Sequence, residues 1–157
     1  MALQQLVAQG ADVLTNHSGS PAVPQAAEER GVRCIAYQSD MARFAPKAQL
    51  AAVTHHWGGY YTQVAQSVLA GRWRAQPVWG RLRDGFVRLS ALSERLPAAE
   101  RAELARLQAG IEAGRWLPFS GRLVDSSGTV RLAQGALDDA QISAMDWFVD
   151  GVQAGRP

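Results

Sequence analysis

Cysteine, lysine and long apolar runs are scarce in this sequence of 157 residues, and each shortage excludes a class of protein. The single cysteine, Cys34, rules out an internal disulfide and a cysteine-based zinc site. The apolar runs extend over only a few residues, far fewer than a membrane-spanning helix needs. Hydrophobic residues make up 47% of the chain and charged residues 19%, a balance that is typical of a folded protein and not of a disordered one.

The chain also lacks a large excess of charge of either sign, because it has 16 basic and 14 acidic residues and a formal net charge of only +2. Lys47 is the only lysine, so the basic residues are otherwise arginines. Arginine and tryptophan alternate between residues 72 and 83, as they do in some RNA-binding proteins. The balanced charge elsewhere favours solvated arginines around a pair of strands instead. We therefore expect no nucleic-acid partner.

The first ten residues predict a short amphipathic helix with Leu3, Leu6 and Val7 on one side. They contain neither the basic nor the apolar segment of a secretory signal, so we predict no signal peptide in this chain. The helix leads straight into an apolar strand. This beginning is compatible with a small protein that starts with a helix and with a fragment whose first half is missing.

The first third of the chain alternates between strand and helix. Short apolar segments predict three strands, at residues 11–15, 32–37 and 50–54. After the first strand, Ser20 and Pro21 predict the N-cap and first turn of a helix, which ends at Gly31. Strands joined by crossover helices predict a parallel sheet with flanking helices, so the expected fold class is α/β.

The rest of the chain predicts further helices and strands. A helix over residues 59–70 carries an apolar stripe that we expect to be buried, and strands at 77–82 and 86–89 flank a turn. A long helix follows Pro97, with Leu104, Leu107 and Ile111 on its inner face. A hairpin is expected at residues 123–132, and Asp138 with Gln141 predicts a capped last helix. The apolar stripe of that last helix is Ile142, Met145, Val149 and Val152.

Ligands of open parallel sheets bind beyond the carboxyl ends of the strands, so the segments after the three predicted strands mark the expected site. The candidate ligand-binding residues in these segments are Asn16, His17, Ser20, Gln38, Asp40, His55 and Trp57. They suit a flat polar heterocycle, because Trp57 can stack on its ring while amide and carboxylate groups bind its edge. Plainer interpretations stay open. Asn16 and Ser20 also suit loops and caps, Asp40 suits turn capping, and Trp57 suits core packing.

Metal and catalytic sites are not predicted. His55 and His56 are adjacent at a strand end, so their side chains point to opposite faces and one metal ion cannot easily bind both. A hydrolase would draw on His17, Asp40 and a serine, but the sequence contains no G-x-S-x-G motif. The glycine pair after the third strand lacks the full pattern of a phosphate-binding loop. We therefore expect no catalytic residue, no metal and no cofactor.

The segments in and around the expected site resemble a known family. The motifs, in order along the chain, are G-A-D-V-L-T-N-H-S-G-S-P-A-V from Gly10, A-Y-Q-S-D-M from Ala36, H-H-W-G-G-Y-Y from His55, V-W-G from Val78 and P-F-S-G from Pro118. Each motif is short, but their ordered succession covers essentially the whole chain. It resembles the basic membrane protein family, whose members are substrate-binding proteins of ABC transporters related to purine-nucleoside-binding lipoproteins.

The resemblance implies a type I periplasmic-binding fold, in which two α/β lobes close on a ligand at a hinge. It also implies that this chain is about the C-terminal half of such a protein, with an incomplete sheet. Residues 1–57 would then form part of the ligand-side lobe, and residues 58–116 would be a crossover segment that contributes to the other lobe. Residues 117–157 would be a hairpin and helix that return to the hinge or the first lobe.

The resemblance further implies a purine-like small-molecule ligand, an inner-membrane ABC permease as partner, and a location in the periplasm or on the cell surface of a bacterium, as a membrane-associated lipoprotein. Two positions depart from the nucleoside-binding branch. Gln38 stands where that branch has an aspartate that contacts ribose, and His55 stands where it has a lysine, while Asp40 is kept. These departures favour a free purine-like base, with a nucleoside still open.

Two other functions stay open beside the solute-binding component of an ABC importer. A ligand-sensing domain of a transcription regulator shares this fold, but it would need a helix-turn-helix, which the sequence does not show. A small α/β enzyme would need a positioned nucleophile or base, and the sequence offers only unpaired candidates. We therefore expect a binding protein and not an enzyme.

Overall fold

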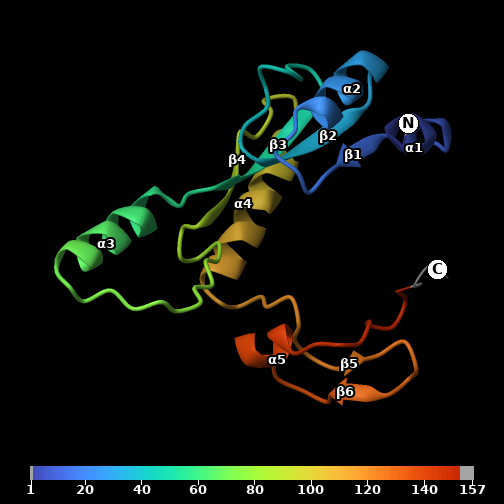
Figure 1. Ribbon diagram of the computed structural model, residues 1–157. Helices are drawn as coiled ribbons and strands as arrows, with labels where there is room; N and C mark the ends of the chain where they lie inside the picture. Colours follow the sequence, from blue (N-terminus) through green and yellow to red (C-terminus); the bar gives the residue numbers. More distant parts are fainter. Residues whose placement is uncertain (1, 153–157) are drawn as a thin grey trace. The chain divides into compact units, whose positions relative to one another are not determined.

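The computed structural model describes residues 2–152, and the chain divides into two compact units, Met1–Glu112 and Ala113–Pro157. In the described part of the chain, the first unit contains a four-stranded sheet with helices, and the second contains a hairpin and a short helix (Figure 1). No helix among the described residues has the length and apolar character that crossing a bilayer requires.

The four strands of the first unit lie side by side in the order in which they occur along the chain. They are β1 (Val13–Thr15), β2 (Arg33–Gln38), β3 (Gln49–His55) and β4 (Val87–Ser90). The first three run parallel to one another, and β4 runs antiparallel beside β3. The predicted α/β fold class is confirmed. The sheet is mixed, however, because β4 returns in the opposite direction.

Four helices belong to this unit. They are α1 (Ala2–Ala8), α2 (Ala22–Arg30), α3 (Gly58–Leu69) and α4 (Ala98–Glu112). The helix α2 ends as predicted, because Gly31 adopts a φ of 68°, a left-handed conformation that glycine enters without a steric clash. Pro21 occupies the N-cap position of α2 rather than its first turn, so the helix begins one residue later than predicted.

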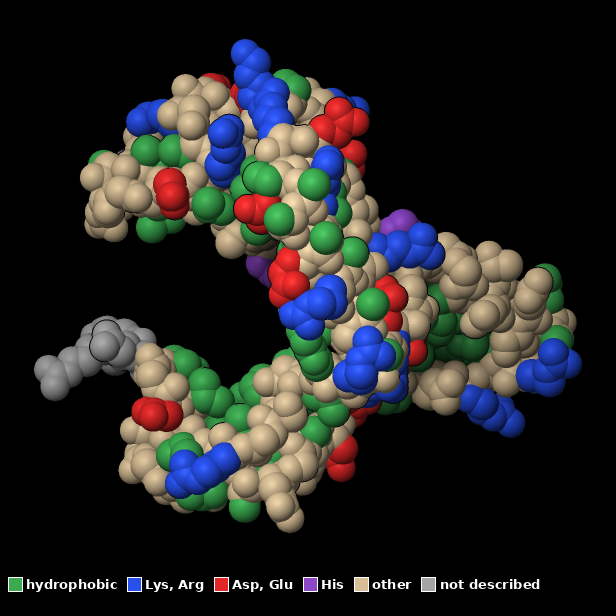
Figure 2. Space-filling model, turned by 180° about the vertical axis from the view of Figure 1, so that it is seen from behind, with side chains coloured by type: hydrophobic (Ala, Val, Ile, Leu, Met, Phe, Trp, Pro, Cys, Tyr) green, Lys and Arg blue, Asp and Glu red, His purple; other side chains and the backbone are tan. Residues whose placement is uncertain are grey.

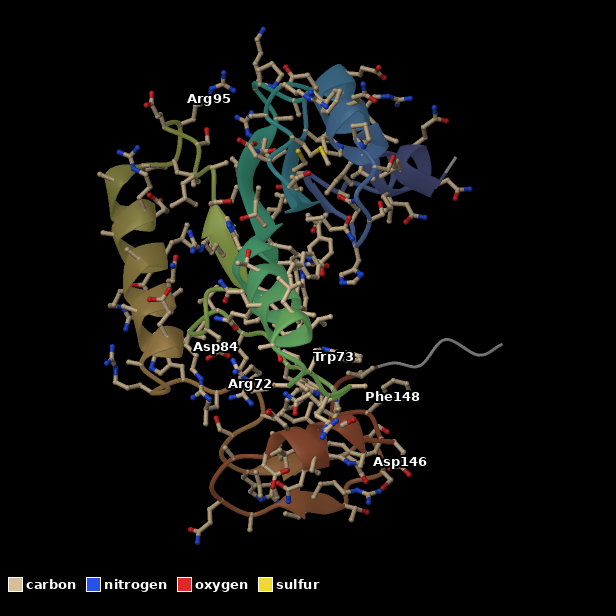
Figure 3. All side chains as sticks on the ribbon, turned by 60° about the vertical axis from the view of Figure 1, so that its left-hand side comes forward. Arg72, Trp73, Asp84, Arg95, Asp146 and Phe148 are labelled. Carbon is tan, nitrogen blue, oxygen red and sulfur yellow. The ribbon has the colours of Figure 1, made fainter. Side chains whose placement is uncertain are left out.

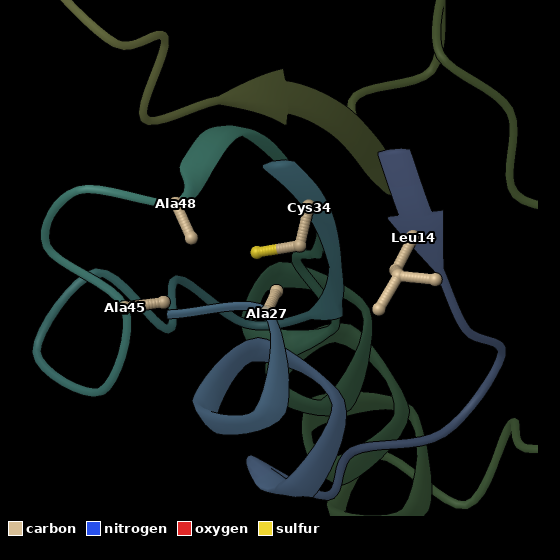
Figure 4. Close-up of a cluster of buried hydrophobic side chains, with 5 residues drawn as sticks. All are labelled: Leu14, Ala27, Cys34, Ala45 and Ala48. Carbon is tan, nitrogen blue, oxygen red and sulfur yellow. The ribbon is translucent and has the colours of Figure 1, made fainter. Parts of the chain in front are cut away.

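Small side chains form the core between α2 and the sheet. The cluster consists of Leu14, Ala27, Cys34, Ala45 and Ala48 (Figure 4). Because most of these side chains are no larger than a methyl group, the helix packs closely on the strands. The carboxylate of Glu28 accepts hydrogen bonds from the backbone N–H groups of Lys47 and Ala48, at 2.9 and 2.7 Å, and so fixes the segment before β3 against α2. Burial, and then the charge of Glu28, raise the pKa of the Cys34 thiol.

Two predictions for the first unit are wrong. Residues 77–82 form no strand, because β4 pairs with β3 and Gly80 lies so close to the Phe86 ring that a Cβ there would collide with it. The apolar stripe of α3 is not buried among the described residues, since Tyr61 is 63% exposed and Leu69 is 89% exposed. Figure 1 shows that α3 lies away from the sheet, which therefore does not cover this face.

The helix α4 follows Pro97 as predicted, but its inner face is only partly covered. Leu104 and Leu107 are half-buried, whereas Ile111 is exposed. The long helix predicted from the sequence is therefore confirmed, and its apolar positions are less deeply buried than their spacing indicates.

The second unit contains the predicted hairpin, β5 (Leu123–Val124) and β6 (Val130–Leu132), in antiparallel pairing. The helix α5 (Asp139–Ser143) begins with the predicted capping box, in which Asp138 and Gln141 bond reciprocally. The predicted stripe of this helix is wrong, because α5 ends at Ser143. Val149 instead pairs with Asp125 as an isolated bridge, and the neighbouring Phe148 is exposed (Figure 3).

Asp125 is the buried anchor of the hairpin turn. Its carboxylate accepts hydrogen bonds from the backbone N–H groups of Ser127 and Thr129, from the Ser127 hydroxyl at 2.6 Å, and from Nε of Arg131 at 2.6 Å. The hydrogen bond from the Ser127 hydroxyl, followed by those from Arg131 and the backbone, holds the pKa of this carboxyl well below its usual range. A lowered pKa means that the charged carboxylate stabilises the folded state.

We expect Asp125→Asn to lower the melting temperature at pH 7 by several degrees, because the amide cannot replace the charged hydrogen bonds. In the unfolded chain the pKa of an aspartate is about 4. A carboxyl whose pKa is lower in the folded state stabilises the fold fully above that pH, and this stabilisation is lost as the pH falls below it. The difference between the two melting temperatures should therefore narrow below about pH 4. Intrinsic tryptophan fluorescence provides the measurement, and Trp147, whose ring centroid lies 5.7 Å from the Arg131 guanidinium carbon, is one of the five tryptophans that contribute to it. Asp146→Asn, at an exposed position of the same unit, is the control. A difference that does not change with pH would contradict this assignment.

Candidate functional site

The site predicted from the sequence lies at the edge of the sheet where β1, β2 and β3 end. Parallel strands place their carboxyl ends on one edge, and β4 begins at this edge because Val87 pairs with His55. Thr15, the last residue of β1, lies opposite Ile35, so β2 continues for three residues beyond the end of β1. The loop after β1 therefore runs beside the last residues of β2.

Three aromatic rings from the three strand ends lie next to one another. The ring centroids of His17 and Tyr37 are 4.2 Å apart with an interplanar angle of 31°, and those of Tyr37 and His55 are 5.1 Å apart in an edge-to-face arrangement. His17 is exposed, while Tyr37 and His55 are half-buried. We call these three side chains the ring row. The structure thus brings together His17 and His55, two of the predicted residues, through a residue that the sequence analysis missed.

The signal for Tyr37 was present in the sequence but was not used. Tyr37 directly precedes the polar segment after β2 and is the only aromatic residue in that strand. Pairing places it opposite Val53 of β3, one residue before Gln38 reaches Thr54. A parallel register of three strands therefore places Tyr37 between the loop after β1 and the end of β3.

Gln38, the last residue of β2, has a strained backbone. Its φ is 69°, a left-handed conformation that costs a residue other than glycine about 1–3 kcal/mol. Its side chain extends toward the loop after β1, where a Cβ on Gly19 would collide with Oε1 of Gln38. Strain of this kind is concentrated at functional sites, because the surrounding structure must maintain it.

Asn16 and Ser20 lie in the same loop after β1. The side-chain amide of Asn16 donates hydrogen bonds to the carbonyl oxygen and the hydroxyl of Ser18, at 2.8 and 2.9 Å. The Oδ1 atom of Asn16 is buried and accepts no hydrogen bond from the described residues, which is unfavourable unless another group binds it. The Ser20 hydroxyl accepts a hydrogen bond from the backbone N–H of Ala22 at 3.2 Å, in the manner of a cap.

Asp40 is turned away from the ring row. Its Oδ1 accepts hydrogen bonds from the backbone N–H of Ala42 and from the side-chain amide of Gln49, at 2.9 and 2.7 Å. Gln49 is buried and is the first residue of β3, whereas His55 is the last, and a strand of this length separates their Cα atoms by about 20 Å. In this structure, Asp40 caps the turn after β2.

Trp57 belongs to a second group of rings at the start of α3. Its centroid lies 4.9 Å from that of Phe86, 5.9 Å from that of Tyr60, and 6.1 Å from that of Tyr61, with which it stacks. Beside this group is a hollow of about 430 Å³, whose lining includes His56, Tyr60, Asp84, Phe86 and Arg88. All three histidines belong to the first unit, and histidine side chains are visible at its surface in Figure 2.

The arrangement offers aromatic rings, amides and imidazole nitrogens at one sheet edge. Among residues 2–152, no group of three or more histidine, cysteine, aspartate or glutamate side chains is placed to hold a metal ion. A side-chain set of this kind binds a flat ligand by stacking and by hydrogen bonds to its edge.

Comparison with known proteins identifies a family. The model for the Bmp family, described as ABC transporter substrate-binding protein PnrA-like, matches residues 1–111. A purine-binding protein of Brucella abortus (strain 2308) is 34% identical over 157 residues, which are 99% of this chain and 45% of that protein. A protein of Haloferax volcanii, named as an ABC transporter glucose-binding protein, is 24% identical over 156 residues, covering 99% of this chain and 38% of that protein.

Solved structures show the same fold. A transcriptional activator of the comK gene from Bacillus halodurans has a TM-score of 0.66 and 21% identity, covering 74% of this chain and 42% of that chain. A solute-binding protein of an ABC transporter system from Conexibacter woesei has a TM-score of 0.54 and 18% identity, covering 74% of this chain and 40% of that chain. The chain spans less than half the length of each of these four relatives. It belongs to the Bmp family of PnrA-like ABC transporter substrate-binding proteins, whose members bind substrates and are not enzymes.

Proposed function

We propose that this chain forms one wall of a cleft that binds a purine-type nucleobase or nucleoside for an ABC importer. The observation that supports it most is the convergence of His17, Tyr37 and His55 at the carboxyl edge of the sheet, where the Gln38 side chain also approaches Gly19 of the loop after β1. In a fold of this class, that edge is where ligands bind.

The purine assignment is supported by chemistry and by one relative. The amides of Asn16 and Gln38 can each donate and accept hydrogen bonds, as the edge of a purine ring requires. The buried Oδ1 of Asn16 accepts no hydrogen bond from the described residues, so it can accept one from a ligand. The Brucella abortus relative is named as purine-binding. The proposed contact residues are Asn16, His17, Ser20, Gln38, His55 and Trp57. We propose that Asp40 does not contact the ligand but stabilises the turn that follows Gln38.

The proposed cleft lies between two lobes, of which this chain supplies one wall. Tyr61, Val68 and Leu69 of α3 are exposed, and an apolar helix face of this kind favours burial against another surface. We propose that residues 1–57 belong to the ligand-side lobe, residues 58–116 cross to the other lobe, and residues 117–157 return. The hollow of about 430 Å³ that Tyr60 and Phe86 line, at the start of α3, is within the usual size range of small-molecule sites.

The setting that we propose follows from the family. Substrate-binding proteins of ABC transporters act outside the cytoplasm, where they deliver a small molecule to a permease in the membrane. We therefore propose an inner-membrane permease as partner and a periplasmic or cell-surface location. A lipid anchor on the full-length protein is part of this proposal.

The proposed ligand can be tested by isothermal titration of adenine, guanine, hypoxanthine, their nucleosides and glucose. Two proteins are compared: the 157-residue chain, and a hybrid in which this chain replaces the segment of the Brucella abortus protein to which it aligns. We expect the hybrid to bind a purine compound, and the chain alone to bind it at least about tenfold more weakly, because one wall cannot shield the ligand from water. Binding of glucose without any purine would overturn the ligand assignment. Equal affinities, with the chain monomeric, would overturn the two-lobe assignment.

Trp57→Ala in the hybrid should weaken purine binding by about 1–3 kcal/mol, the usual contribution of an aromatic ring stacked on a base. The control is Trp73→Ala, at a tryptophan that is 47% exposed. Equal losses in both variants would show that the effect at Trp57 is not specific to the ligand.

Substitutions of Gln38 should separate backbone strain from ligand binding. Gln38→Gly should be more stable to urea than Gln38→Ala by about 1 kcal/mol, because glycine adopts the left-handed conformation without a Cβ clash. Both variants lose the amide, so both hybrids should bind the purine about tenfold more weakly than the unsubstituted hybrid. Full affinity in either variant would remove Gln38 from the set of ligand contacts.

A further inference from the structure

We propose that Tyr37 is the positioning residue of the binding site, because it holds the rings of His17 and His55 in fixed orientations. The residue stands between the two histidines, with its ring centroid 4.2 Å from one and 5.1 Å from the other. The identity of the ligand rests on the proposed function, but the arrangement of the three rings does not.

Tyr37 has firmer backbone support than His17, whose ring it contacts. It lies within β2, where it pairs with Val53 of β3. His55 also lies in a ladder, where it pairs with Val87 of β4, whereas His17 follows the end of β1. A side chain within a hydrogen-bonded ladder has a more restricted backbone than a side chain in a loop, so Tyr37 orients the ring of His17.

Two consecutive residues of β2 contact the loop after β1. Tyr37 contacts it through the ring of His17, and Gln38 contacts it at Gly19, where its side chain occupies the space that a Cβ would need. Within the loop, Asn16 is tied to Ser18 by two hydrogen bonds. The end of β2 therefore acts as a template for this loop.

His56 lies outside this arrangement and is an internal reference. Its Nε2 atom is 2.9 Å from the hydroxyl oxygen of Thr54, and its backbone N–H donates to the carbonyl oxygen of Phe86. Alternation along an extended strand directs its side chain to the opposite face from that of His55. Loss of the Tyr37 ring should therefore affect His17 and His55 but not His56.

This arrangement gives the site a defined hydrogen-bonding pattern. A neutral imidazole has one donor and one acceptor nitrogen, and the direction of its ring plane decides which ligand atoms these can meet. Fixed imidazole planes select a flat heterocycle with donors and acceptors along its edge, and they reduce the ordering that binding would otherwise require.

Proton NMR of the 157-residue chain tests the geometry directly, because it contains only three histidines. In Tyr37→Leu, the ring-proton shifts of His17 and His55 should change, since the aromatic ring current is lost, whereas those of His56 should stay the same. Tyr37→Phe should preserve all three sets of shifts. Unchanged shifts of His17 and His55 in Tyr37→Leu, or equal changes at His56, would overturn the proposal.

Titration of the hybrid with the purine compound that it binds tests the role. Tyr37→Phe should keep the affinity within about twofold, and Tyr37→Leu should lower it about tenfold. Phe148→Leu, at an aromatic residue of the second unit that is 57% exposed, is the matched control and should leave the histidine shifts unchanged. An equal loss in Tyr37→Phe and Tyr37→Leu would mean that the phenol contacts the ligand, which overturns a purely positioning role. If no purine binds, the proposed ligand fails, while the NMR result still decides the geometry.

Discussion

The parallel register of β1, β2 and β3 is the constraint on which the site depends. Pairing of Thr15 with Ile35 and of Gln38 with Thr54 sets how far each strand extends past its neighbour. A shift by one residue would turn every side chain of a strand to the other face and would separate Tyr37 from both histidines. The small core side chains and the Glu28 carboxylate maintain this register, because they hold α2 and the segment before β3 closely against the strands.

Sequence reasoning works best here where local chemistry decides the structure. Gly31 and the Asp138–Gln141 capping box end and begin helices at or near the predicted positions. It fails where long-range contacts decide the structure. The spacing of apolar residues in α3 does not show that the sheet leaves this face of the helix exposed. Strand propensity predicts a strand at residues 77–82, but it does not show that β4 pairs with β3 and not with this segment.

The sequence predicts the segments that meet at this sheet edge better than it predicts the directions of their side chains. The rule that ligands bind beyond the strand ends needs only the order of the strands, so it identifies the loops after β1, β2 and β3. It cannot show which way a side chain turns. Asp40 follows β2, yet its carboxylate bonds to Gln49 at the other end of β3. The rule considers only residues after the strand ends, and Tyr37 lies inside a strand. Its ring nevertheless contacts those of both His17 and His55.

The close approach of Gln38 to Gly19 links the side chains that these two positions can carry. Because the Gln38 side chain occupies the space beside Gly19, a larger residue at position 19 becomes acceptable only if the side chain at position 38 is shortened or redirected. A shorter residue at position 38 would in turn free position 19. Because Oε1 is the far end of a flexible side chain, a residue larger than glycine at position 19 would turn the Gln38 amide away, so a change in the loop after β1 would alter the group that β2 presents at its end.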